Sequence, residues 1–410
     1  MRRISSIEIE NFKSLVDFEI KLDHFTCLIG LNGAGKSTVL QFIDFLSQLV
    51  RGDMEGWLDE RKWKATEIKS KLSRKKYIYF CVRFINEDGE PAGRWEGNYN
   101  PTSNSCIYER IDMLDFLLEA KKQEMKLYKD KYHTKTRIIP LTDIPTSATS
   151  KWDMQWKSEI TFDYQGSILS VLKKELLPES ILECKKLFED MKSLDLLAPE
   201  YLRQRTRESA GTMGRGGQNL SAFLYEMNEQ KQIELIKQLK EIYQQLSGLR
   251  SKSLRSGWKQ IEISEQYEDA SDGFVPTMTT EARHINDGML RLIAILAELQ
   301  SEYVFLLFDE IENGINPELV EFVLNALVSS EKQIVVTTHS PMILNYLEDE
   351  TARKGVIYLY KTKRGHTKSI PFFSIPSLAE KLTVMGPGEA FVDTDLFALA
   401  NEINEITEDE

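Results

Sequence analysis

The chain has 410 residues, of which 52 are Lys or Arg and 64 are Asp or Glu; its formal net charge is −12, and 41% of its residues are apolar. This composition excludes a disordered tail protein and is sufficient for one large or two medium domains. An acidic chain is a poor candidate for non-specific nucleic-acid binding, although the acidic excess lies entirely in residues 284–410 and the rest is close to neutral.

Membrane insertion and export are not indicated by the sequence. No apolar run approaches the roughly 18 uncharged residues that span a bilayer, and the basic N-terminus is followed by a strand-like alternation, not by a signal peptide core. The cysteines are far apart and lack zinc-ligand spacing; they are Cys27, Cys81, Cys106 and Cys184. We therefore expect a cytoplasmic protein with reduced thiols and no membrane contact.

The N-terminal segment predicts three strands and a helix. Apolar and polar residues alternate over 4–10 and 16–20, and residues 25–29 form a short apolar run. From residue 36 to residue 50, apolar residues recur at helical spacing. A glycine-rich turn separates the third strand from this helix.

Residues 51–283 are harder to assign. Helical patterns fit residues 113–131, 180–191 and 220–246, strand patterns fit 77–84 and 261–263, and 211–217 predict a glycine-rich loop. We expect an inserted, mostly helical lobe or arm with some strands.

Residues 284–375 return to alternating strands and helices. Strands are predicted at 303–308, 333–337, 355–361 and 367–372, and a helix at 317–328. With the N-terminal elements, they predict an α/β fold with a parallel or mixed sheet, built from residues 1–50 and 284–375. Residues 376–410 then form an acidic C-terminal extension.

The turn at residues 30–37 reads Gly-Leu-Asn-Gly-Ala-Gly-Lys-Ser and matches the P-loop pattern G-x-x-x-x-G-K-[ST]. In a P-loop the backbone N–H groups surround phosphate oxygens, the lysine reaches the outer phosphates, and the serine hydroxyl binds Mg²⁺. The residues expected to bind ATP here are Asn32, Gly33, Ala34, Gly35, Lys36, Ser37 and Thr38, and Ser37 is also expected to bind the metal.

Two acids and a histidine follow the later strands. Beside a P-loop, Asp309 is expected to hold Mg²⁺ through water, and Glu310 to polarise the water that attacks the γ-phosphate. His339, beyond strand 333–337, is placed to donate to the γ-phosphate. The catalytic candidates are therefore Glu310 and His339, and the metal candidates Ser37 and Asp309.

Together these motifs resemble the ATP-binding-cassette (ABC) heads of the RecF, SMC and OLD ATPases. The resemblance rests on the P-loop, the acidic strand end and residues 7–14, 312–317 and 337–341. It implies an ABC-ATPase head in which residues 312–317 form the D-loop and His339 is the switch histidine.

The resemblance also implies a signature segment before the two acids, matched by residues 285–291. Asn286 stands where the family usually has serine, and it is still able to cap a helix. With Asp287 and Gly288 it is expected to contact ATP held by another subunit, so that two heads enclose the nucleotide. The departure at Asn286 bears on hydrolysis rate more than on dimer formation. The alternative is a capped core helix without this role.

The inserted region offers candidate contacts with nucleic acid. Basic residues cluster in 51–76 and 121–137, and the tryptophans available for stacking are Trp57, Trp63, Trp95, Trp152, Trp156 and Trp258. The near-neutral charge of the region favours a solvated surface instead. A tighter group could contact ATP phosphate across a dimer or a partner protein; it consists of Arg203, Arg205, Arg207 and Arg215.

The motifs are compatible with three functions. One is an ATPase that dimerises around ATP and Mg²⁺, as a homodimer or higher homo-oligomer, and controls a separate effector, a nuclease or toxin, in anti-phage defence. A second is a RecF-like ATPase that binds DNA directly in repair or genome maintenance. The third is a self-contained OLD-type nuclease, which needs a metal-binding domain. Asp393 and Asp395 form a D-x-D pair, but the sequence shows neither a sheet to hold them nor a further acid to complete a metal site. We expect the first function and keep the second as the alternative.

Overall fold

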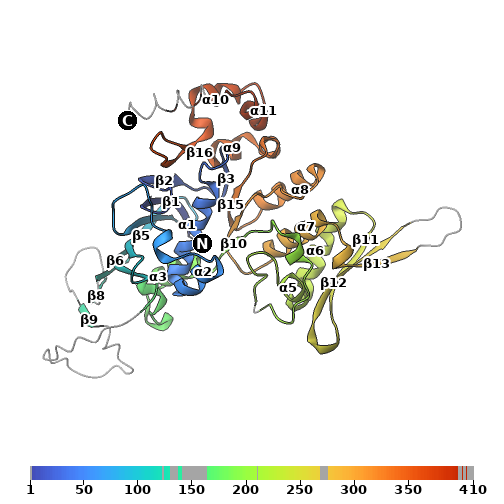
Figure 1. The fold of residues 1–410 in the computed structure, drawn as a ribbon, viewed down its shortest axis with the longest axis horizontal. Coiled ribbons are helices and arrows are strands. Elements are labelled where there is room, and N and C mark those ends of the chain that lie inside the picture. The colour runs from blue at the N-terminus through green and yellow to red at the C-terminus, as the bar shows by residue number, and fades with distance from the viewer. Residues whose placement is uncertain are drawn as a thin grey trace. The chain divides into compact units, whose positions relative to one another are not determined.

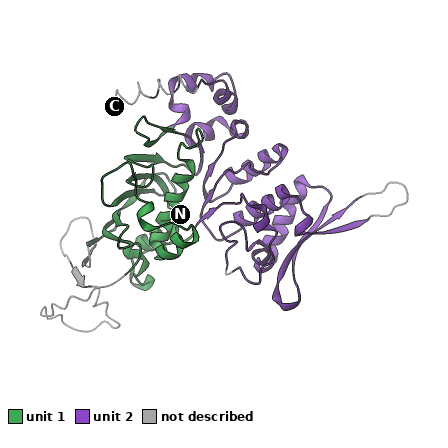
Figure 2. Cartoon of the chain, in the orientation of Figure 1, with its two compact units in different colours: residues 1–23, 30–191, 359–370 green, residues 24–29, 192–358, 371–410 purple. Residues whose placement is uncertain are grey.

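The computed structural model describes residues 2–121, 124–129, 137–140, 164–209, 211–267 and 276–395, together with residues 399 and 403. Trp152, Trp156, the side chains of the basic cluster 121–137 and the acidic tail 404–410 lie outside the described part. Two compact units are present (Figure 2). Unit 1 comprises residues 1–23, 30–191 and 359–370, and unit 2 comprises residues 24–29, 192–358 and 371–410. This division differs from the predicted head and insert, because residues 51–191 group with the P-loop helix and residues 192–283 with the later strands.

Unit 1 is built on an antiparallel sheet in the order β2-β1-β4-β5-β6-β7-β8-β9. Its strands are β1 Arg3–Glu10, β2 Phe18–Lys21, β4 Ile78–Ile85, β5 Pro91–Asn100, β6 Ser105–Met113, β7 Phe116–Lys121, β8 Glu124–Lys129 and β9 Arg137–Pro140. Its helices are α1 Lys36–Arg51, α2 Met54–Glu60 and α3 Glu179–Glu189. The core includes an aromatic cluster in which Phe45 of α1 contacts Phe12, Trp57 and Tyr99.

Two predictions for the inserted region are wrong. The described part of 113–131 is not a helix, because it contains the end of β6 and strands β7 and β8. Leu118 and Ala120 are buried on either side of the less buried Glu119, which is the alternation of a strand. The described part of 51–283 is also not mostly helical, since it contributes strands β4 to β13 as well as short helices. Cross-strand pairing stabilises these segments, and a local helical pattern does not reveal it.

Unit 2 contains a parallel arrangement that determines where its polar residues meet. Strands β14 (Phe305–Phe308), β15 (Gln333–Thr337), β3 (Phe25–Ile29) and β16 (Val356–Lys361) are neighbours in this order, with β10 (Met191–Leu194) beside β14. β15 pairs in parallel with both β14 and β3, which lies next to it in Figure 1. β3, β14 and β15 are completely buried, as expected for strands covered on both faces.

The other elements of unit 2 are helices and a smaller sheet. The helices are α4 Pro199–Leu202, α5 Leu220–Glu226, α6 Glu229–Ile242, α7 Asp287–Leu299, α8 Pro317–Val328, α9 Asp349–Gly355, α10 Pro376–Lys381 and α11 Pro387–Val392. A three-stranded antiparallel sheet consists of β11 Leu246–Ser253, β12 Lys259–Gln266 and β13 Thr277–Glu281. Strand β17, Thr367–Pro371, follows β16 along the chain, and its residues 367–370 belong to unit 1. No helix in the described ranges is both long and apolar enough to cross a membrane.

Candidate nucleotide site

The P-loop of unit 1 requires glycine at two positions, Gly30 and Gly35. Gly30 has φ +143°, and a Cβ there would lie 2.3 Å from the carbonyl oxygen of Leu359. Gly35, at φ +115°, would place a Cβ 2.5 Å from Oγ1 of Thr367. The loop is therefore tight at both glycines, as expected of a turn that brings backbone N–H groups to a phosphate.

Lys36 begins α1 and is buried, with 5% of its surface exposed. Its Nζ donates to the carbonyl oxygen of Gly30 at 2.7 Å, so the ammonium lies over its own loop. Ser37 and Thr38 occupy the first turn of α1, whereas Asn32 and Gly33 are exposed on the loop. All the predicted P-loop residues thus lie at the N-terminus of one helix, where the helix dipole favours anions.

A hydroxyl pair supports the P-loop and was not predicted from the sequence. Thr367 is fully buried, and its Oγ1 donates to the carbonyl oxygen of Ala34 at 2.9 Å. Ser14 lies 2.8 Å from the same Oγ1 and accepts from the N–H of Thr367 through its carbonyl oxygen. Neither residue has a sequence signal for this role, because 353 positions separate them.

In unit 2 the two predicted acids follow β14 and are joined to the end of β15. The hydroxyl of Thr337 donates to Oδ1 of Asp309 at 2.5 Å, and its oxygen accepts from the N–H of Glu310 at 2.8 Å. Glu310 has φ +49°, a left-handed conformation that is costly for a residue with a side chain. Thr337 therefore orients both acids, although its sequence context alone does not indicate this.

The structure brings His339 and Glu310 close to each other. Nε2 of His339 lies 3.4 Å from Oε1 of Glu310, and both side chains are partly exposed. Glu312 of the predicted D-loop accepts from the backbone N–H groups of His339 at 2.8 Å and of Ser340 at 3.1 Å. The histidine loop is thus held by the segment that follows Glu310.

The predicted signature segment opens α7. Asn286 caps this helix, since its Oδ1 accepts from the N–H of Met289 at 2.8 Å. Arg203 forms an ion pair with Asp287 and donates to the carbonyl oxygen of Ile285. A Cβ on Gly288 would lie 2.8 Å from the carbonyl oxygen of Gly314, so this turn of α7 closely approaches the predicted D-loop.

Arg291, on the next turn of α7, is 5% exposed. Its Nη2 donates to the carbonyl oxygen of Glu310 at 2.5 Å and lies 3.4 Å from that of Asp309. Burial lowers the pKa of Arg291 to about 10, while nearby carboxylates, Glu312 first among them, oppose this effect. The guanidinium stays charged at neutral pH.

The remaining predicted arginines have partners within unit 2. Arg205 lies 3.6 Å from Glu281, Arg215 lies 3.2 Å from Asp195, and the guanidinium of Arg207 lies 5.0 Å from the ring centre of Trp258. Trp57 and Trp95 are buried and contribute to the core of unit 1. Trp63 is partly exposed, and Trp258 is 41% exposed.

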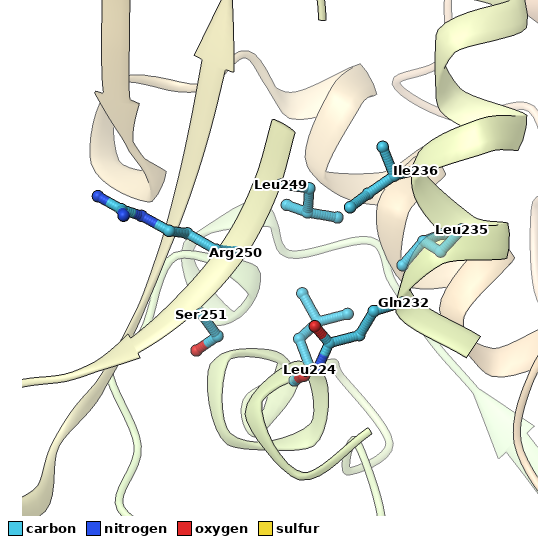
Figure 3. Close-up of a pocket in the computed structure, with 7 residues that line it drawn as sticks. All are labelled: Leu224, Gln232, Leu235, Ile236, Leu249, Arg250 and Ser251. Carbon is cyan, nitrogen blue, oxygen red and sulfur yellow. Dashed lines mark hydrogen bonds between the residues drawn. The ribbon is translucent and has the colours of Figure 1, made fainter. Parts of the chain in front are cut away.

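Two hollows in the described structure contain none of the predicted site residues. One lies between α5, α6 and β11 and is lined by Leu224, Gln232, Leu235, Ile236, Leu249, Arg250 and Ser251 (Figure 3). Its volume of about 10 Å³ has room for one water at most. The other, about 300 Å³, lies along β4, β5 and β6 in unit 1. Among the described residues, no cluster of three or more His, Cys, Asp or Glu side chains forms a metal site.

A family model described as an AAA ATPase domain matches residues 2–344. The chain belongs to this ATPase family. Among solved structures, this AAA ATPase is similar to an SMC head bound to the C-winged helix domain of ScpA, with a TM-score of 0.51 and 14% identity over 90% of this chain and 97% of that chain. This similarity shows the mixed α/β fold of an SMC-type ATPase head, as the sequence predicts.

A second similar structure is the SMC head domain from Thermotoga maritima, at a TM-score of 0.44 and 12% identity over 90% of this chain and 98% of that chain. No curated protein matches the sequence.

Proposed function

We propose that this AAA ATPase binds ATP with Mg²⁺ and hydrolyses it between two copies of the chain. The observation that supports this most is the hydrogen-bonded group of Asp309, Glu310 and Thr337 at the carboxyl ends of parallel strands, with Nε2 of His339 3.4 Å from Oε1 of Glu310. β3 belongs to the same set of strands, since Leu28 pairs with Thr337, and the chain continues from β3 directly into the P-loop. Ligands of parallel α/β sheets bind at this edge.

The residues suggest a division of labour. Lys36 and the P-loop N–H groups bind the phosphates, while Ser37 and Asp309 are suited by their oxygen atoms to hold Mg²⁺. Mg²⁺, when bound, neutralises charge on the phosphates. Glu310 accepts a proton from the attacking water, and His339 donates from Nε2 to the γ-phosphate. Asn286, Asp287 and Gly288 contact the nucleotide held by the second copy.

The test is phosphate release by the full chain with ATP and Mg²⁺. Glu310→Gln keeps the size and hydrogen-bonding shape of the side chain but removes the base, so kcat is expected to fall about 10²- to 10⁴-fold. ATP binding, measured with a fluorescent analogue, is expected to persist. Equal kcat values for wild type and Glu310→Gln would overturn the proposal.

The biological role is inferred from the resemblance to OLD-like ATPases. In this role, the ATP-bound assembly, a homodimer of heads or a higher homo-oligomer, controls a separate nuclease or toxin in anti-phage defence. The test is co-purification, with and without ATP, of the chain and the product of a neighbouring reading frame. A complex that forms equally with Lys36→Ala contradicts nucleotide control.

Direct DNA binding in the manner of RecF is the alternative role. It predicts affinity that falls steeply with salt, because phosphate contacts release counterions. Binding to duplex DNA measured from about 50 to 200 mM salt tests this role. Absent or salt-insensitive binding excludes it.

A further inference from the structure

We propose that Arg291 is a positioning residue that holds the backbone of Glu310 and thereby couples the signature helix α7 to the catalytic base. The inference rests on the proposed function, because it assigns Arg291 a part in that same hydrolysis. Arg291 touches no nucleotide in this proposal and acts only through Glu310.

The conformation of Glu310 is the first support. A residue with a side chain persists at φ +49° only if its surroundings hold it there. Two contacts do so from opposite sides of the residue: Thr337 accepts from its N–H, and Arg291 donates to its carbonyl oxygen. The same carbonyl oxygen also accepts from the N–H of Asn313 at 3.1 Å, so loss of Arg291 would leave this local turn bond and remove the contact that ties Glu310 to α7.

The position of Arg291 on α7 is the second support. Gly288 and Arg291 are three residues apart, so they lie on the same face of the helix. Gly288 approaches the carbonyl oxygen of Gly314, and Arg291 binds those of Asp309 and Glu310. One face of α7 therefore contacts both ends of the loop from residue 309 to residue 314. A shift of α7 caused by a ligand at its N-terminus would move this loop with it.

The burial of Arg291 is the third support. Its Nε is buried and has no hydrogen-bond partner among the described residues. Burying a guanidinium with an unsatisfied N–H costs desolvation free energy, and an apolar side chain would fill the same space without this cost. We therefore attribute its presence to the hydrogen bonds with the carbonyl oxygens of Asp309 and Glu310, and not to packing.

The test compares Arg291→Met, which keeps apolar volume and removes the donors, with Arg291→Lys, which keeps the charge and one donor group. With Arg291→Met, kcat is expected to fall at least about tenfold while KM stays within about threefold. Arg291→Lys is expected to recover part of kcat. Arg250→Met is the matched control, because Arg250 is 64% exposed and pairs with Glu262 away from the acids; its kcat should equal that of wild type.

Hydrogen exchange separates positioning from a purely structural role. Arg291→Met should speed exchange of the amides of residues 310–314 and leave those in the second half of α7 protected. Faster exchange throughout α7 would mean that Arg291 only stabilises the helix, and unchanged kcat would overturn the proposal outright. If Arg291→Met does not fold, Arg291→Lys decides: wild-type kcat and exchange overturn the proposal, whereas reduced kcat with local exchange supports it. Unchanged kcat in Glu310→Gln instead identifies a failure of the proposed function.

Discussion

Glu109 shows how a single buried carboxylate makes the stability of unit 1 depend on pH. It is fully buried, and it accepts hydrogen bonds from Oγ of Ser167 at 2.5 Å, the N–H of Ile168 at 2.6 Å and Nε1 of Trp95 at 3.2 Å. Burial raises its pKa to about 7, and the three hydrogen bonds offset this only in part. Between about pH 4.5 and pH 7, the folded state therefore keeps a proton on Glu109 that the unfolded chain has already released.

The sign of the pH dependence follows. Because the pKa is raised on folding, this contribution to stability is complete below about pH 4.5 and is lost as the pH rises to about 7, by about 3 kcal/mol. Urea unfolding between pH 5 and 8 measures how the free energy of unfolding changes with pH. The Glu109→Gln variant is the comparison, and its free energy of unfolding should fall less steeply over this range. Identical slopes for the two proteins would contradict the prediction.

Thr337 orients both acids through one hydroxyl, so its removal should affect catalysis more than folding. Thr337→Val keeps the shape of the side chain but leaves Asp309 and the N–H of Glu310 without this partner. We expect kcat to fall about 10- to 100-fold, the usual cost of misplaced catalytic groups. Thr337→Ser retains the hydroxyl and should keep most of the activity; a fully active Thr337→Val would show that the bond is dispensable.

At the scale of elements, the first two turns of α7 bring together three features: the Asn286 cap, the contact with the predicted D-loop and Arg291. Its cap is the departure from the usual serine of the family, and the structure confirms that Asn286 forms the capping bond. The contact with nucleotide stays a prediction. The cap has a separate, measurable energetic effect.

Asn286→Ala should lower the free energy of unfolding by about 1 kcal/mol, because the N–H of Met289 loses its acceptor. Asn286→Ser, which restores a capping hydroxyl, should unfold like wild type. Chemical denaturation measures both. If the alanine variant is as stable as wild type, water satisfies the helix end and the cap is energetically unimportant.

For the whole molecule, the proposed function makes oligomeric state depend on the nucleotide. A ligand shifts an assembly only through its differential affinity for the assembled state. In the proposed function, Lys36 supplies phosphate contacts and Glu310 ends the bound state by hydrolysis, so Lys36→Ala and Glu310→Gln should change the assembly in opposite directions.

Light scattering with ATP and Mg²⁺ should show Lys36→Ala as a monomer and Glu310→Gln as a persistent dimer or larger assembly. Without nucleotide, both should match wild type. If Lys36→Ala and wild type have the same molar mass in the presence of ATP, oligomerisation does not depend on nucleotide binding.

Some features were determined by the sequence alone. The P-loop, the acidic strand end, the histidine loop and the α/β character of the fold follow from short motifs and local periodicity, because glycines, charges and apolar runs act within a few residues of each other. Helix α1 and strands β1, β3, β14 and β15 lie where the sequence predicts them.

Only the tertiary structure decided the rest. The strands at residues 113–129 depend on pairing with neighbours, and the supporting roles of Thr367, Thr337 and Arg291 depend on contacts between distant segments. Such partners carry no local signal, since a threonine or arginine looks the same in sequence whether it faces water or holds a catalytic loop. Folding brings these residues together because buried polar groups must find hydrogen-bond partners wherever the chain supplies them.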